Sequence, residues 1–223
     1  MPGWWKEGDE TPIAAVAICL TDGNALATHV GIVHQLSDKS ADLQLIHLAW
    51  HYKLKVELFG VPPHPLYLIL TPKVHRTRLE FLATRCRQVA RRRPALPYGF
   101  RLQKDAFFDV DGTYQVKDNR GLTCSTFVIV LFRSAEINLV DDTTWMSRTD
   151  DVERHKLLLQ ILEKNSNIES EFLEKVREDL STVRIRPEET AGCCLAPALP
   201  VVFSKAQKFG HEVLMRLLQH SSE

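Results

Sequence analysis

Cys124 and two histidines, His29 and His47, are the residues whose types and positions suggest covalent catalysis. Cys124 follows Gly121 and Thr123, which suit a tight turn and a helix N-cap, so the thiol would lie in the first turn of the next element. If that element is a helix, its free N–H groups and its dipole lower the thiol pKa and can also bind an oxyanion. Such a thiolate can act as a nucleophile.

A reactive cysteine also needs a base, and His29 is the best placed of nine histidines. In a strand, His29, Gly31 and Val33 share one face, and Gly31 leaves space beside the His29 ring. His47 shares a face of the next predicted strand with two leucines, where a second imidazole can orient the first. Alternatively, both histidines are partly exposed strand residues with satisfied hydrogen bonds.

The elements that must position these residues change type along the chain. Apolar runs separated by turn residues predict strands over 13–20, 29–36 and 43–50. Apolar spacings of three and four residues predict helices from Pro72 to Pro94 and over 152–163, 168–180 and 203–219. Acidic residues directly after Pro187 predict the start of a further helix. Arg184 and Arg186, which precede this helix, can border a substrate cleft, although nothing in the sequence requires this role. Strands first and helices later indicate an α+β domain with a mostly antiparallel sheet covered on one side.

Residues 127–132, Phe-Val-Ile-Val-Leu-Phe, leave the nature of the Cys124 element open. Their β-branched and aromatic side chains favour a buried strand, in which a cysteine is most often a small core residue. Periodicity alone does not separate a buried strand from a buried helix over so short a run.

The order of these motifs resembles the circularly permuted NlpC/P60 papain-like proteins, most of all the YiiX-like group and more distantly lecithin:retinol acyltransferase. His29, Gly31, Ile32 and Val33 match the family's histidine strand, and the matching cysteine motif is Cys124-Ser125-x-Phe127-Val128. In that superfamily the histidine strand precedes the cysteine helix, which is the reverse of the order in papain.

The resemblance implies an antiparallel sheet packed on helices, with a permuted papain-like core over residues 1–148. The helices over 149–223 have no counterpart in the family, and we expect them to form an extension packed on that core. It implies a helix at Cys124, with Cys124 as nucleophile, His29 as general base and His47 as the orienting third residue. Tyr98 and Ser125 are candidates for oxyanion or substrate contacts. The implied activity is that of a cysteine peptidase, amidase or acyltransferase acting on an amide, isopeptide or ester bond of a peptide, protein or lipid through a thioacyl intermediate. No metal or organic cofactor is expected.

Two other functions stay open. Asp109-Val110-Asp111-Gly112-Thr113 matches the signature of haloacid-dehalogenase-like phosphatases, in which the first Asp attacks phosphorus with the help of Mg²⁺. Its apolar lead-in is too short for a central parallel strand, and Asp-Gly also favours a hairpin turn. The other function is that of a non-catalytic interaction module retaining the papain-like fold, with Trp4, Trp5 and the late helices as contact surfaces.

Composition limits these choices. The 28 basic residues equal the 28 acidic ones, which argues against a dedicated nucleic-acid binder. The apolar runs are too short for a membrane span, and the N-terminus lacks the features of a secretion signal, so we expect a cytoplasmic protein. Five cysteines without a C-x-x-C pair indicate free thiols.

Overall fold

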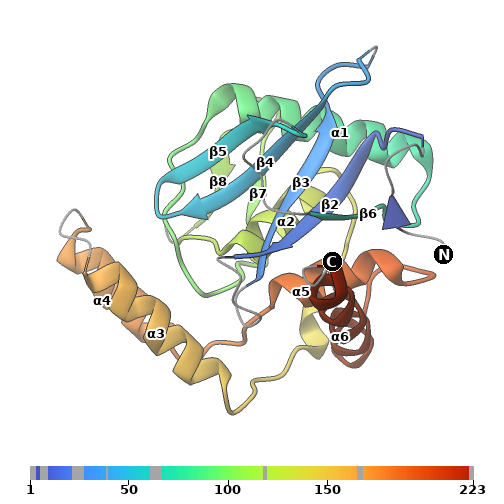
Figure 1. Ribbon diagram of the computed structural model, residues 1–223. Coiled ribbons are helices and arrows are strands. Elements are labelled where there is room, and N and C mark those ends of the chain that lie inside the picture. Colours follow the sequence, from blue (N-terminus) through green and yellow to red (C-terminus); the bar gives the residue numbers. More distant parts are fainter. Residues whose placement is uncertain are drawn as a thin grey trace.

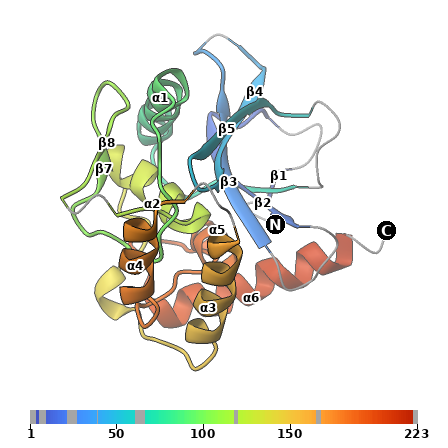
Figure 2. The same ribbon diagram turned by 90° about the vertical axis from the view of Figure 1, so that its left-hand side faces the viewer.

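The computed structural model describes residues 4–5, 10–21, 28–38, 40–60, 67–117, 120–164 and 168–220. An antiparallel sheet and a set of helices make up an α+β architecture (Figure 1). Helices α1 (Arg76–Arg92) and α2 (Cys124–Ser134) lie against one face of the sheet, and the C-terminal helices gather at one end of it (Figure 2).

The sheet has the strand order β1-β6-β2-β3-β4-β5 and is antiparallel throughout. Its strands are β1 (Trp4–Trp5), β2 (Ala14–Leu20), β3 (Thr28–Gln35), β4 (Leu43–Trp50), β5 (Lys53–Leu58) and β6 (Leu68–Leu70). The three predicted strands are confirmed as β2, β3 and β4. The sequence reading missed β5 and β6, because β5 is a largely polar edge strand and β6 is very short.

The two faces of the sheet are packed differently. Val16, Ile18, Ile32 and Ile46 face the helices and belong to the main core. The opposite face carries a smaller buried cluster that includes Ala15, Ala17, Val33 and Leu45 and packs against Phe59 and Tyr67. The centre of this second face is therefore buried too, in contrast to the expectation that the sheet is covered on one side.

The predicted helices are confirmed in type and approximate position. The remaining helices are α3 (Asp151–Glu163), α4 (Ser170–Glu178), α5 (Pro187–Gly192) and α6 (Phe203–His220), with short 3₁₀ turns at Asp142–Thr144 and Cys193–Leu195. A separate hairpin pairs β7 (Phe107–Phe108) with β8 (Tyr114–Gln115). Proline at the first position of α5 and acids in its first turn agree with the predicted helix start. None of the helices described above is both long and apolar enough to traverse a bilayer.

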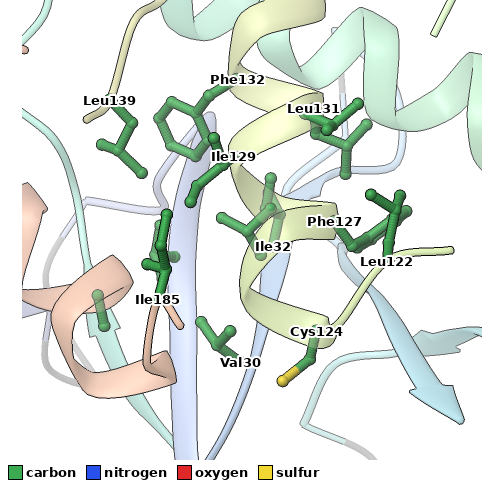
Figure 3. Packing of buried hydrophobic residues seen from close by; sticks show 14 of the residues in the cluster. Val30, Ile32, Leu122, Cys124, Phe127, Ile129, Leu131, Phe132, Leu139 and Ile185 are labelled. Carbon is green, nitrogen blue, oxygen red and sulfur yellow. The ribbon is translucent and has the colours of Figure 1, made fainter. Parts of the chain in front are cut away.

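Helix α2 lies at the centre of the main core. All residues from Cys124 to Phe132 are buried, because α2 contacts β3 and β4 on one side and α1, β7 and α5 on others. Figure 3 shows side chains of α2 packed among those of Ile32 on β3, Leu139 and Ile185. A helix that is apolar all round is stable where every side is covered, so tertiary burial overrides the strand propensity of this segment.

The chain after residue 149 joins the same core. Ile185, Ala206, Val213 and Leu217 belong to the hydrophobic cluster that contains α2 and the inner face of the sheet. Helix α5 contacts β2, β3 and α2, and α6 packs on α5. Residues on both sides of the expected boundary at residue 148 therefore belong to one hydrophobic core. This packing brings C-terminal residues close to the thiol.

Candidate active site

Cys124 occupies the first position of α2, directly after the N-cap residue Thr123. Thr123 and Thr126 form a capping box in which the Thr123 N–H donates to Thr126 Oγ1 at 2.8 Å and the Thr126 N–H donates to Thr123 Oγ1 at 3.1 Å. An α-helix offers its first N–H groups no acceptor within the helix. Since the capping box uses the N–H groups of Thr123 and Thr126, those of Cys124 and Ser125 are left for a ligand.

Three neighbouring strands supply a chain of side chains beside the thiol. His29 Nε2 on β3 lies 2.6 Å from His47 Nδ1 on β4, and the two rings meet edge to face. His47 Nε2 lies 3.4 Å from Glu57 Oε2 on β5. The structure thus joins the two predicted histidines and adds Glu57, which the sequence reading missed together with its strand.

Gly31 allows β3 and β4 to approach at this point. A Cβ atom at Gly31 would lie 2.7 Å from His47 Cβ and 2.8 Å from the backbone oxygen of Ile46. Real side chains do not come this close, so any residue but glycine would push His47 away. Space beside the His29 ring was expected at Gly31, and the structure shows that His47 fills it.

The His29 ring acts on the Cys124 thiol through its charge and through hydrogen bonding. Burial alone would raise the thiol pKa, since Cys124 is 8% exposed. The charge and hydrogen bond of His29 outweigh burial, with further help from the Val30 backbone and from Arg184, so the pKa of Cys124 lies below its ordinary value. Figure 3 shows the sulfur at the N-terminal end of α2, next to Val30 of β3.

The other four cysteines have the opposite character. Burial raises the pKa of Cys19 to about 11, and it also raises the pKa values of Cys86, Cys193 and Cys194. All five thiols are free. Cys124 is thus distinguished from the rest by its electrostatic surroundings rather than by its burial.

Tyr98 reaches the site because two glycines close the loop that separates it from Cys124. The Leu122 N–H donates to the Pro97 oxygen at 2.9 Å, and the Gly99 N–H donates to the Leu122 oxygen at 3.3 Å. A Cβ atom at Gly121 would lie 2.3 Å from the Pro97 oxygen. The loop between Gly99 and Gly121 contains the β7–β8 hairpin, and its two ends are joined by these hydrogen bonds. Tyr98 therefore lines the same cleft as Cys124.

Ser125 is placed differently from Tyr98. Its side chain is 1% exposed, and within the described part of the chain its Oγ has no hydrogen-bond partner. Its contribution to the cleft is the backbone N–H at the second position of α2. Burial raises the pKa of Tyr98, so its hydroxyl stays protonated and able to donate.

A cleft of about 240 Å³ opens over the thiol. One side comes from the sheet and α2, with His29, Trp50 and Tyr98 beside Cys124. The other side comes from the C-terminal region, which contributes Arg154, Leu158 and the segment 184–188. Arg184 and Arg186, which were expected to be able to border a substrate cleft, both line this cleft.

Comparisons of the chain with protein-family models, with curated proteins and with solved structures gave no match. The geometry of the cleft and the Cys124–His29–His47–Glu57 arrangement therefore form the basis for the function proposed below.

Asp109 and Asp111 lie away from this cleft, in the turn of the β7–β8 hairpin. Asp109 accepts the backbone N–H groups of Asp111 and Thr113, both at 2.9 Å, and the Gln115 amide at 2.9 Å. Gly112 adopts a φ of 76°, which suits glycine at such a turn. The motif follows a two-residue antiparallel strand, whereas the phosphatase mechanism needs the end of a central parallel strand. Its residues serve here as a hairpin turn.

Proposed function

We propose that this protein is a cysteine hydrolase or acyltransferase of the permuted, YiiX-like papain type, with Cys124 as the nucleophile and His29 as the general base. The observation that carries the proposal is the position of the thiol at the start of α2, in one cleft with His29, the first member of the His29–His47–Glu57 chain. The chain order supports the family assignment, because the histidine strand comes before the cysteine helix. The substrate bond is an amide, isopeptide or ester.

Acylation of Cys124 begins with proton transfer to His29. The thiolate adds to the carbonyl carbon of the substrate, forming a C–S bond while the carbonyl electron pair moves onto oxygen. The Cys124 and Ser125 N–H groups, with the Tyr98 hydroxyl, are placed to stabilise that oxyanion. When the oxyanion collapses, the bond to the leaving nitrogen or oxygen breaks, and His29 gives its proton to the leaving group. A thioester on Cys124 remains.

Deacylation reverses these proton movements. Water, or an acceptor amine or hydroxyl, attacks the thioester carbonyl while His29 takes its proton. The C–S bond then breaks, the acyl group leaves on the new acceptor, and the proton returns to the Cys124–His29 pair. Water as acceptor gives hydrolysis, and an amine or alcohol gives acyl transfer.

His47 and Glu57 position the base. Burial and the neighbouring His29 lower the pKa of His47 to about 4, so His47 is neutral at pH 7. A neutral His47 can accept the His29 Nε2–H at its Nδ1 while its own Nε2–H donates to Glu57. This tautomer leaves Nδ1 of His29 free to take the thiol proton, so the chain fixes both the orientation and the tautomer of the base.

Acylation by p-nitrophenyl acetate, followed by mass spectrometry of the intact protein, tests the proposal. We expect one acetyl group on Cys124 in the wild type and none at that position in Cys124→Ala. Cys19→Ala is the matched control, because the raised pKa of Cys19 keeps it protonated, and this variant should acylate like the wild type. Equal acetylation of wild type and Cys124→Ala would refute the nucleophile, and an inert Cys124 would favour an interaction module.

A further inference from the structure

Arg184 differs from the other arginines packed around it. Arg186 pairs with Asp150 at 2.7 Å and with Asp151 at 3.2 Å, and Arg148 pairs with Asp151 and Glu189. Among the residues that the structure describes, no carboxylate lies within ion-pair distance of the Arg184 guanidinium. A partly buried cation is normally paired, because removing it from water carries a cost in free energy.

Arg184 lies close enough to the thiol to act on it. Arg184 lines the cleft over Cys124 and acts electrostatically on both Cys124 and Tyr98. Its backbone is fixed, since the Arg148 guanidinium donates to the Arg184 carbonyl oxygen at 2.7 Å. The backbone at Arg184 is therefore anchored at the wall of the cleft.

We propose that Arg184 binds a carboxylate of the substrate, close to the bond that Cys124 attacks. The substrate class is then an amide or ester that carries a carboxylate within a few atoms of the scissile carbonyl. This inference rests on the proposed function, because it assigns the substrate of that same site. The planar guanidinium presents paired N–H donors that match the two oxygens of a carboxylate.

One feature of the cleft favours a carboxylate over a phosphate, and another limits the size of the ligand. Glu188 lines the same cleft, and its carboxylate accepts the Thr28 hydroxyl at 2.8 Å. An acidic charge of the protein therefore lies close to any anion that Arg184 binds. A doubly charged phosphate would be repelled by Glu188 more strongly than a singly charged carboxylate. The volume of about 240 Å³ also suits a group the size of one amino-acid residue rather than a large ligand.

Alkylation of Cys124 by iodoacetate and by iodoacetamide separates this role from general thiol reactivity. The two reagents are nearly the same in shape, and both lose iodide to the thiolate, but iodoacetate carries the carboxylate. The ratio of their rate constants cancels any change in the thiolate fraction. We expect Arg184→Gln to lower the iodoacetate-to-iodoacetamide ratio about tenfold and Arg184→Lys to lower it less.

Arg91→Gln is the matched control, because Arg91 is exposed in the last turn of α1 and does not line the cleft. Its ratio should equal that of the wild type. A ratio in Arg184→Gln within about twofold of the wild-type value would overturn the carboxylate site. If neither reagent modifies Cys124 faster than the other thiols, the proposed function fails instead.

Ligand protection gives a second, independent readout. Glutarate should slow iodoacetamide labelling of the wild type and protect Arg184→Gln much less. Stronger protection by inorganic phosphate than by glutarate would contradict the assignment to a carboxylate. Glutarate binding measured by calorimetry tests Arg184 even if Cys124 is inert, and equal affinity of wild type and Arg184→Gln would then overturn the proposal.

Discussion

Cys124 is subject to opposing effects on its thiol. Burial disfavours the thiolate, while the His29 imidazole, the Val30 backbone and Arg184 favour it and prevail. Cys124, His29 and His47 were site candidates from the sequence, because residue type and strand alternation limit where a nucleophile and its base can lie, and the structure brings the three together. Glu57 was missed, since its strand shows no apolar run and its carboxylate approaches His47 only once β4 and β5 pair.

Substitution of His47 tests the positioning role at the scale of single residues. We expect His47→Ala to slow iodoacetamide alkylation of Cys124 at pH 7 by about 10²-fold, because His29 loses the acceptor that fixes its tautomer. His47→Gln keeps a polar acceptor on the same strand and should restore part of the rate. Stopped-flow alkylation kinetics provide the measurement, and equal rates for wild type and His47→Ala would exclude a role for His47.

At the scale of elements, α2 shows where local preference and tertiary structure disagree. The residues after Cys124 favour a strand by propensity, yet they form a helix because the sheet, α1 and α5 bury every side of it. The position of Tyr98 was equally hard to predict from the sequence. Its proximity to Cys124 depends on the contact of Gly121 with Pro97, which closes a loop whose length alone suggests separation.

The β7–β8 hairpin gives a prediction that separates stability from chemistry. Asp109→Asn removes a carboxylate that accepts two backbone N–H groups, so the free energy of unfolding should fall by about 1 kcal/mol. Iodoacetamide labelling of Cys124 should stay unchanged, because the turn lies outside the cleft. Urea unfolding measures the change in stability, and the rate of iodoacetamide labelling measures the reactivity of Cys124. A loss of Cys124 reactivity in Asp109→Asn would contradict this separation.

For the whole molecule, the main feature is that the C-terminal region completes the site. Helix α5 lies beside α2 and β3 (Figure 1), and the segment before it lines the cleft over Cys124. The sequence predicted the helices of this region, because their apolar stripes have helical spacing. We also expected them to pack on the core, but the sequence does not show which of their residues line the cleft, since this depends on contacts between residues far apart in the chain.

Buried His34 predicts a dependence of global stability on pH. His34 is fully buried, and burial lowers its pKa from 6.5 to about 4. Below pH 6.5 His34 is therefore protonated in the unfolded chain but stays neutral in the folded protein. The free energy of unfolding falls as a result when the pH falls toward 4. Between pH 7 and pH 5 the loss from His34 is about 2 kcal/mol.

The His34→Leu variant isolates this contribution. Its loss of stability between pH 7 and pH 5, measured by urea unfolding, should be smaller than that of the wild type by about 2 kcal/mol. His47, whose pKa is also lowered to about 4, titrates in both proteins and cancels in the comparison. An equal loss in wild type and variant would show that His34 takes up its proton in the folded state as readily as in the unfolded chain.

The central claim, that His29 activates the Cys124 thiol, is tested most directly by the pKa of that thiol. The pH dependence of iodoacetamide alkylation, followed by mass spectrometry of the peptide that contains Cys124, gives this value. We predict a midpoint below the ordinary thiol pKa of about 8.5 in the wild type and a clearly higher midpoint in His29→Gln. A wild-type midpoint at or above the ordinary value, or the same midpoint in both proteins, would contradict the account.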